Sequence, residues 1–351
     1  MPEGGSWGTR IVGGRSVVLA VLTLLTACGG SPLATPSAPP ATVPPASAPH
    51  PPTSPSVLAD PTGATFDGAG DLWVCNYRAS TLVMYARADL VGRRMHASPS
   101  PIEPRVEISG LSGPNGIVFD RAGDLWAVEY GSDSVVAYTP SQLRTSGSPA
   151  PAIVVSSNGD ALSAPTGLAF DRSGSLWVSN QRTGDVVAYR PAQIRRSAAP
   201  RPAVVLRMPD GANSQAVAFA PDGWLWVARY DADEVLGFSP AELGRTGSPP
   251  PAGRVQLEAV SGPIGLAVDR SGRLWVALNV GSEVEAFPRR GAAGVPRPVT
   301  RLTGHGLEEP HGVAFDAQGD AWITAHDDLV LRYPHAVAAG GVRTAPDLIL
   351  S

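Results

Sequence analysis

The sequence predicts an all-β protein, a six-bladed β-propeller built from four-stranded antiparallel blades. A period near 50 residues with several short strands per unit is typical of propellers, because one unit cannot bury both of its faces alone. The repeat predicts a single domain over residues 60–351, with blades beginning near residues 61, 114, 165, 214, 263 and 310. Its clearest marker is one tryptophan per unit, at intervals of 53, 51, 49, 49 and 47 residues: Trp73, Trp126, Trp177, Trp226, Trp275 and Trp322.

The first 27 residues are expected to form a targeting segment. Arg10 and Arg15 precede an apolar run over residues 17–25, which is too short for a permanent membrane span. The run ends in Leu25-Thr26-Ala27-Cys28, which resembles the bacterial lipobox. That resemblance implies a signal peptide over 1–27 and lipidation of Cys28, and so a lipoprotein of the bacterial cell envelope on the extracytoplasmic side of a cell membrane. The alternative is an ordinary signal peptide with a chance cysteine.

Residues 28–59 predict a disordered tether between the lipid and the propeller. Ser, Pro, Ala and Thr dominate this stretch, and such a composition favours an extended, semi-rigid chain without a core. The formal net charge of −4 gives no basic field for nucleic acid, which is therefore not expected as a partner. The partners expected are a membrane, through the lipid anchor, and a small-molecule, peptide or protein ligand. The protein is expected to be a monomer. The other cysteine, Cys75, is expected to be a buried apolar residue without a disulfide.

Each blade is predicted to begin with a short apolar inner strand and a tight turn. The inner runs, such as Leu168-Ala169-Phe170, suit strands buried between neighbouring blades. A glycine follows in every copy, and five copies open the turn with an aspartate that can cap turn amides. We therefore interpret these aspartates as structural: Asp67, Asp120, Asp171, Asp269 and Asp316.

The remaining strands of a blade follow in a fixed order. The second strand carries the tryptophan, which is expected to wedge between adjacent blades. The third ends in an aromatic residue, and an outer strand follows a proline-rich link. The chain is predicted to end on the outer strand of blade six, so that closure of the ring depends on packing between blades one and six.

Function is expected on one face of the propeller, which we call the variable face. Its loops join the second strand to the third and each blade to the next, whereas the other face, the turn face, carries the regular glycine turns. Three positions per blade are expected to surround the mouth of the channel on the variable face. They are the second residue of the inner strand, which follows a proline or, in blade four, Ser214 (Thr62, Asn115, Thr166, Gln215, Ile264, His311), the residue three beyond the tryptophan (Asn76, Glu129, Asn180, Arg229, Leu278, Ala325) and its successor (Tyr77, Tyr130, Gln181, Tyr230, Asn279, His326).

The repeated segment, as in Pro165-Thr166-Gly167-Leu168-Ala169-Phe170-Asp171, resembles the NHL repeat and its six-bladed relatives over residues 60–351. These relatives include the gluconolactonase and regucalcin lactonases and the virginiamycin B lyases. The lactonase resemblance implies a divalent cation such as Ca²⁺, held here by Asn115, Glu129 and Asn180. The sequence departs from the lactonases at Thr62, where they carry a glutamate, and at Ile264, where they carry an aspartate.

The lyase resemblance implies a histidine base near a carboxylate and a cation. The strand end Trp126-Ala127-Val128-Glu129 resembles that family, and His311 and His326 of blade six are the candidate bases. Asp327 and Asp328 stand where a matching glutamate would be expected. The alternative for both histidines is a structural role in hydrogen-bonded loops.

Two functions of different classes follow. The first is recognition of a small molecule, peptide or protein through the variable face, as in NHL sensor and scaffold domains, which requires no cofactor. The alternative is a metal-dependent lactonase-like hydrolase or a lyase at the same mouth, with no catalytic residue assigned. The candidate ligand-binding residues are Asn76, Tyr77, Glu129, Tyr130, Asn180, Arg229, Tyr230, Asn279, His311 and His326.

Overall fold

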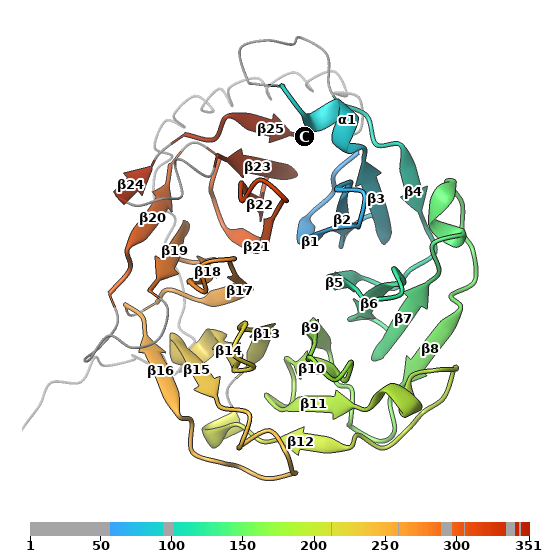
Figure 1. Cartoon of the computed structure of the whole chain (residues 1–351), viewed down its shortest axis with the longest axis vertical. Coiled ribbons are helices and arrows are strands. Elements are labelled where there is room, and N and C mark those ends of the chain that lie inside the picture. The colour runs from blue at the N-terminus through green and yellow to red at the C-terminus, as the bar shows by residue number, and fades with distance from the viewer. Residues whose placement is uncertain are drawn as a thin grey trace, which may run out of the picture. The chain divides into compact units, whose positions relative to one another are not determined.

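Six antiparallel sheets stand around a central axis in the computed structural model, which confirms the predicted propeller (Figure 1). The structure describes residues 57–93, 102–211, 213–258, 260–288, 297–304, 306–334, 341–343 and 345–351. The signal segment, Cys28 and most of the tether lie outside these ranges and stay predictions. Within them, no helix is long and apolar enough to cross a membrane.

The inner strands begin where the sequence places the start of each blade. Neighbouring inner strands approach closely: a Cβ on Gly116 would lie 2.6 Å from the carbonyl oxygen of Thr166 in the next blade. Glycine is therefore required there, because no side chain fits between the two backbones. The six strands are β1 (Pro61–Phe66), β5 (Pro114–Phe119), β9 (Pro165–Phe170), β13 (Ser214–Phe219), β17 (Pro263–Val268) and β21 (Pro310–Phe315).

The second strands place the tryptophans between blades, as predicted. Trp177 is only 3% exposed, and its ring meets Phe219 of the next blade edge-on at 5.9 Å between centroids. Its indole N–H donates to Asp171 at 3.1 Å, so the turn aspartate also fixes the ring. These strands are β2 (Leu72–Asn76), β6 (Leu125–Glu129), β10 (Leu176–Asn180), β14 (Leu225–Arg229), β18 (Leu274–Leu278) and β22 (Ala321–Ala325).

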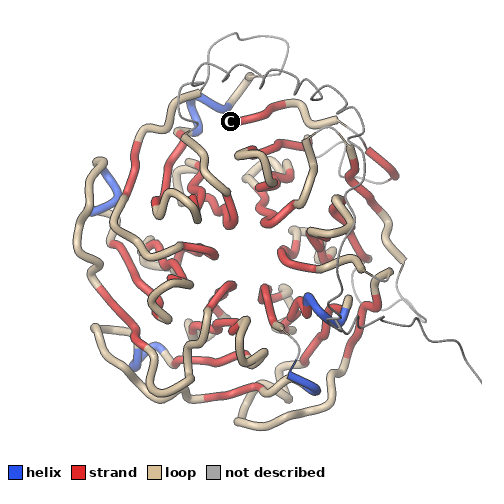
Figure 2. Tube along the Cα trace, turned by 180° about the vertical axis from the view of Figure 1, so that it is seen from behind, coloured by secondary structure: helices blue, strands red, loops and turns tan. Residues whose placement is uncertain are grey.

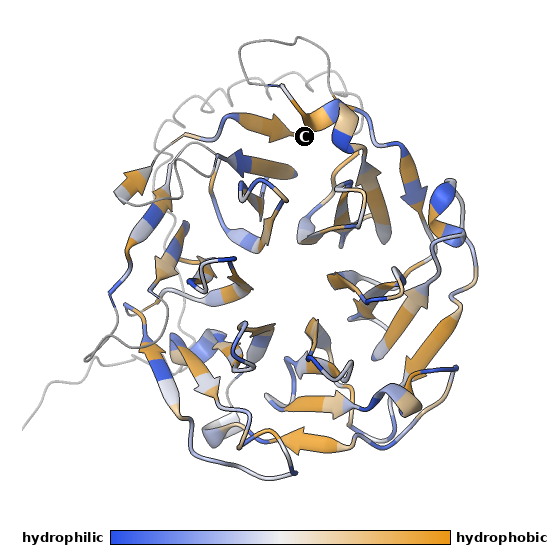
Figure 3. Ribbon diagram, in the orientation of Figure 1, coloured by the Kyte–Doolittle hydropathy of each residue, from blue (hydrophilic) through white to orange (hydrophobic). Residues whose placement is uncertain are grey.

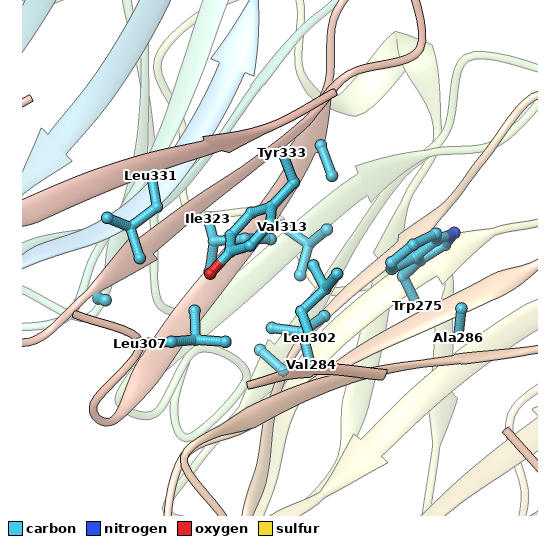
Figure 4. Close-up of a cluster of buried hydrophobic side chains, with 12 residues drawn as sticks. Trp275, Val284, Ala286, Leu302, Leu307, Val313, Ile323, Leu331 and Tyr333 are labelled. Atoms are coloured by element: carbon cyan, nitrogen blue, oxygen red, sulfur yellow. The ribbon is translucent and has the colours of Figure 1, made fainter. Parts of the chain in front are cut away.

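The third strands complete a hydrophobic core that repeats between blades. Figure 4 shows one such cluster, in which Trp275 of blade five faces Val313 and Tyr333 of blade six. Figure 3 shows hydrophobic residues concentrated on the strands and hydrophilic residues on many of the loops. The third strands are β3 (Thr81–Tyr85), β7 (Ser134–Tyr138), β11 (Val186–Tyr189), β15 (Glu234–Phe238), β19 (Glu283–Phe287) and β23 (Leu329–Tyr333).

The outer strands lie at the circumference, where Figure 2 shows them from behind. They are β4 (Val106–Ile108), β8 (Ile153–Ser156), β12 (Val204–Leu206), β16 (Gly253–Gln256), β20 (Thr300–Thr303) and β25 (Leu348–Leu350). Short helices lie in the loops: α1 (Arg87–Leu90), η1 (Gln142–Arg144), η2 (Pro191–Gln193), η3 (Pro209–Gly211) and η4 (Tyr230–Ala232).

An unpredicted girdle joins the outer edges of neighbouring blades. Strand β24 (Gly341–Arg343), from the last link of blade six, pairs in parallel with β20 of blade five. Isolated parallel bridges repeat the contact, from Gly147 to Ile108, from Ala198 to Val155 and from Gly247 to Leu206. Each of these links covers part of the exposed edge of the preceding blade, which protects it from pairing with another chain.

Blades one and six meet without a swapped strand, as predicted. Phe66 packs edge-on against Trp322 at 5.8 Å, and the hydroxyl of Thr324 donates to the carbonyl of Thr62 at 2.7 Å. Arg332 on β23 also donates to the carbonyls of Leu90 and Arg93. Among the residues that the structure describes, side-chain hydrogen bonds and core packing join blade six to blade one.

Candidate functional site

The channel at the axis contains a small cavity. It measures about 140 Å³ and is lined by the inner strands, including the six predicted channel positions from Thr62 to His311. The threonines there are engaged: Thr62 donates to the carbonyl of Asn115 at 2.8 Å, and Thr166 to that of Ser214 at 3.2 Å. A ligand larger than this cavity would extend to the mouth of the channel.

The residues three beyond the tryptophans have a different environment from the one expected. In blade three, Asn180 is fully buried; its Oδ1 accepts the Ser163 amide at 3.0 Å and its Nδ2 donates to the Ala161 carbonyl at 3.1 Å. Asn76 makes the corresponding bonds to Ala59 and Val57. These side chains hold the loop that enters their own blade.

Glu129 has the same position in blade two and is 8% exposed. Its Oε1 accepts the Ser112 amide at 3.1 Å, while its Oε2 accepts the hydroxyls of Ser132 and Ser134 at 2.7 and 2.8 Å. Both carboxylate oxygens are thus already hydrogen-bonded within the blade. A cation bound by Glu129 would have to share these oxygens with their present donors.

Arg229 takes this position in blade four and is 1% exposed. Its guanidinium donates to Glu234 at 2.5 Å and to the carbonyl of Pro209 at 2.8 Å, and Arg254 pairs with the other oxygen of Glu234 at 2.6 Å. A buried charge needs such partners to offset its loss of hydration. This arginine therefore holds the entering loop, as the asparagines and the glutamate do in their blades.

A second repeated feature, which we call the latch, links blades to their neighbours, and the sequence analysis missed it. In five of the six blades the residue before the inner strand has a positive φ, as at Asp60 (55°), Ala164 (49°) and Glu309 (44°). The backbone N–H of this residue donates to a side-chain oxygen in the turn between the second and third strands of the preceding blade. Asp133 accepts from Ala164 at 2.6 Å, and Asp328 accepts from Asp60 at 2.7 Å, across the closing seam of the ring.

The residues that directly follow the buried anchors form a set that we call the rim. Each rim residue is half-buried, and its backbone N–H donates to a carbonyl just before the inner strand of its own blade, at 2.9 to 3.3 Å. This bond fixes the backbone of the rim in every blade. The rim consists of Tyr77, Tyr130, Gln181, Tyr230, Asn279 and His326.

The rim tyrosines are packed against their surroundings. The rings of Tyr77 and Tyr130 meet edge-on, with centroids 6.0 Å apart. Burial raises the pKa of the Tyr77 hydroxyl, with smaller effects from Tyr130 and Asp60. Burial likewise raises the pKa of Tyr230, with the charges of Asp231 and Glu309 adding to the shift. The phenols of Tyr77 and Tyr230 therefore stay protonated and can both donate and accept hydrogen bonds.

The predicted pair of histidines lies at the seam between blades six and one. His311 lines the channel, with its Nδ1 3.9 Å from Asp60 and without a hydrogen-bond partner among the described residues. Burial lowers the pKa of His311, which Asp60 and Glu309 counter and His326 reinforces. His326 is more exposed and lies 3.2 Å from Asp327. Burial therefore favours the neutral form of the imidazole, which can accept a proton.

The predicted metal ligands do not form one cluster of unoccupied donors. Asn115 lines the channel, whereas the oxygens of Glu129 and Asn180 are bonded to the loops of their own blades. In the described part of the chain, no three His, Cys, Asp or Glu side chains gather as a metal site would need. A metal site that combines the amide oxygens of Asn115 and Asn180 with the carboxylate of Glu129 stays a prediction.

Comparison with known proteins supports the fold class. No protein-family model and no curated protein sequence matches the chain. Among solved structures, a virginiamycin B lyase from Staphylococcus aureus is similar at a TM-score of 0.51 and 15% identity, over 79% of this chain and 84% of that one. A histidine variant of that lyase with quinupristin is similar at 0.52 and 14%, over 83% and 90%. A structure described as a putative gluconolactonase is similar at 0.54 and 16%, over 77% and 87%.

These similarities establish a shared propeller architecture. The resemblance to both groups of six-bladed propellers, which the repeat had suggested, is confirmed at the level of the fold. At 14 to 16% identity the comparisons assign no activity to this chain.

Proposed function

We propose that the protein recognises a ligand or partner through the rim on its variable face. The observation that carries this proposal is that adjacent residues have different roles, one holding a loop and the next facing solvent in part. The anchors Asn76, Glu129, Asn180 and Arg229 are buried in hydrogen bonds, whereas the next residue in each blade is half-buried on a fixed backbone. Side chains held in this way suit recognition, since little conformational entropy is lost on binding.

The chemistry of the rim supports a ligand with both apolar and polar groups. Three tyrosines provide rings and hydroxyls, a combination that is enriched where proteins bind one another. Gln181, Asn279 and His326 add donors and acceptors between them. The channel cavity of about 140 Å³ supports contact at the mouth by any larger ligand.

The anchoring of the protein is part of the same proposal. Lipidation of Cys28 would place the propeller on the extracytoplasmic side of a membrane, on a tether that lets the rim reach partners. In Cys28→Ala we expect unprocessed precursor without incorporated labelled fatty acid. Normal acylation of that variant would overturn this part of the proposal without touching recognition by the rim.

The test of the proposal uses the mature, tagged protein recovered from the envelope of cells that express it. We expect a small molecule or protein to co-purify with the wild type and to be depleted at least about tenfold when Tyr77 and Tyr130 are both changed to Ala, since loss of central aromatic contacts costs more than about 1.4 kcal/mol. Arg270→Ala on the turn face is the matched control and should retain it. Equal recovery with the rim variant would reject the proposal.

A second candidate function is an enzyme at the same mouth. The specific observation in its favour is His311, a half-buried channel-lining imidazole with a lowered pKa and an Nδ1 that has no hydrogen bond among the described residues. The proteins of similar fold include a lyase and a putative gluconolactonase, which makes a lyase or a lactonase-like hydrolase the class to test. His311 would then act as the base.

Metal dependence separates the two candidates. Both enzyme families that the repeat resembles need a divalent cation, which would raise the melting temperature by binding the native state alone. Calcium, magnesium, manganese and zinc at millimolar concentration would be added to the wild type and to Glu129→Gln. A shift in the wild type that Glu129→Gln removes supports the enzyme. No shift with any ion would reject the metal-dependent enzyme and leave recognition in place.

A further inference from the structure

The largest cavity described in the propeller lies on the turn face, opposite the rim. It measures about 780 Å³ and opens among the turns of blades two, three and four. The last residues of three inner strands, Phe119, Phe170 and Phe219, form its apolar part with Ile194. Volumes of this size are typical of sites for small organic ligands.

Three arginines line the same cavity, and two of them are unpaired. Arg121 donates to the carbonyl of Arg172 at 2.8 Å. Within the described ranges, no hydrogen bond or ion pair engages the guanidinium of Arg172 or of Arg195. In blade five the equivalent Arg270 donates across to Ala317 of the next blade at 2.7 Å, but Arg172 faces a blade whose turn reads Ala220-Pro221. The repeat is thus broken at the cavity.

The carboxylates of the lining do not neutralise these arginines directly. Asp120 and Asp171 hold turn amides with one oxygen and a tryptophan N–H with the other. Burial raises the pKa of the third, Asp124, and the charge of Asp120 adds to this. The lining contains three arginines and three aspartates, so its formal charges cancel. Whether it can bind an anion therefore depends on which of these groups are free to reach a ligand. The acids are held in the turns, while two guanidinium groups remain available.

We propose that this cavity binds an amphipathic anion, a small molecule with an apolar or aromatic body and one carboxylate or sulfonate group. The body would lie against the phenylalanines, where burial of apolar surface drives binding. The anionic group would pair with Arg172 and Arg195, whose planar guanidinium groups suit such oxygens. This site lies on the other face from the rim and is independent of the function proposed there.

The probe is 1-anilinonaphthalene-8-sulfonate, an aromatic body with one sulfonate, and its neutral counterpart is N-phenyl-1-naphthylamine. We expect saturable binding of the anionic probe to the folded mature protein at one site. Changing Arg172 and Arg195 to Ala should weaken its binding about tenfold or more, because a charged hydrogen bond contributes about 1.5–3 kcal/mol. Binding of the neutral probe should change less than about threefold.

A cavity-filling variant with a matched control locates the site. Ala122 lies in the cavity lining, and Ala69 occupies the same place in the turn of blade one, away from the cavity. Ala122→Trp should abolish binding of both probes, whereas Ala69→Trp and Arg270→Ala should retain it, with unfolding transitions checked for each variant. Unsaturable binding, retained binding in Ala122→Trp, or equal loss of both probes in the arginine variant would overturn the proposal. Occupation of the cavity by a second copy of the chain, detected by light scattering, would also overturn it.

Discussion

The two faces of the propeller use their polar residues in opposite ways. On the turn face, one aspartate in each of five blades, as at Asp171, repeats the same bonds to turn amides and to a tryptophan. On the variable face, the anchor differs in type from blade to blade, yet Asn180, Glu129 and Arg229 all hold the loop that enters their blade. The anchor position therefore varies in residue type although its structural role, holding the entering loop, is the same in these blades. The rim residues follow it directly in the sequence.

The comparison teaches that neither regularity nor variability alone locates a site. The regular face contains the larger cavity, whose lining includes the turn at which blade four departs from the repeat. On the variable face, the half-buried rim residues lie one position beyond the buried anchors, which vary in chemical type from blade to blade. Predictions on the two faces and on the layer between them can separate scaffold from site.

The largest effect is expected in the tryptophan layer that both faces share. Trp177→Ala should destabilise the protein by about 3–5 kcal/mol, because it removes a large buried ring and leaves a cavity at the seam. Denaturant unfolding measures the change. Gln181→Ala, on the rim of the same blade, is the control and should stay within about 0.5 kcal/mol. A cost below about 1 kcal/mol for Trp177→Ala would mean that the ring is not part of the core.

The second effect concerns the turn face. Asp171→Ala should cost about 1–3 kcal/mol, because the indole N–H of Trp177 loses its partner in a buried seam. Asp222, in the divergent turn of blade four, accepts only a long 3.3 Å bond from Trp224, so Asp222→Ala should cost less. Equal costs in thermal unfolding would show that the aspartate–tryptophan bond does not stabilise the turn face.

The third effect concerns the latch on the variable face. Asp233 accepts the amides of Val260, Ser261 and Gly262 at 2.7 to 2.9 Å. Because these loop amides can bond to water instead, Asp233→Ala should cost only about 1 kcal/mol. Hydrogen exchange should quicken over residues 260–262 and stay unchanged at the corresponding loop of blade three. A global increase in exchange would contradict a local latch.

The smallest effect is pH-dependent. Burial holds the pKa of His311 below its usual value of about 6.5, although Asp60 and Glu309 oppose the shift and His326 adds to it. The unfolded chain therefore takes up a proton first, so the contribution of His311 to stability is complete above about pH 6.5 and declines as pH falls toward its folded pKa. His311→Gln should lose this part of the slope below about pH 6.5. An unchanged slope would place the titration on another group.

Much of the fold could be predicted because the repeat fixes both strand order and packing. The inner strands, the tryptophan wedge and the aspartate caps all follow from residues that recur in most or all of the six units. Strand β24 could not be found, because it pairs residues about 40 positions apart in two different blades and copies no motif.

The candidate site was only partly predictable. Asn76 and Asn180 lie three residues beyond a tryptophan, and successive side chains of a strand alternate between its faces. They therefore face away from the tryptophan side, toward the loop that enters their blade, and this alternation was the available signal. The latch was harder to find, because Asp133 and Ala164 become neighbours only when adjacent blades pack.

The most direct test of the central claim is a comparison of photo-crosslinking from the two faces in the native envelope. A photoreactive benzoylphenylalanine would replace Tyr130 or Tyr230 on the rim, or Ala69 on the turn face away from the cavity, in the full chain. The account predicts a specific adduct by mass spectrometry from both rim positions and none from position 69. Adducts from position 69 with none from the rim would contradict recognition through the variable face.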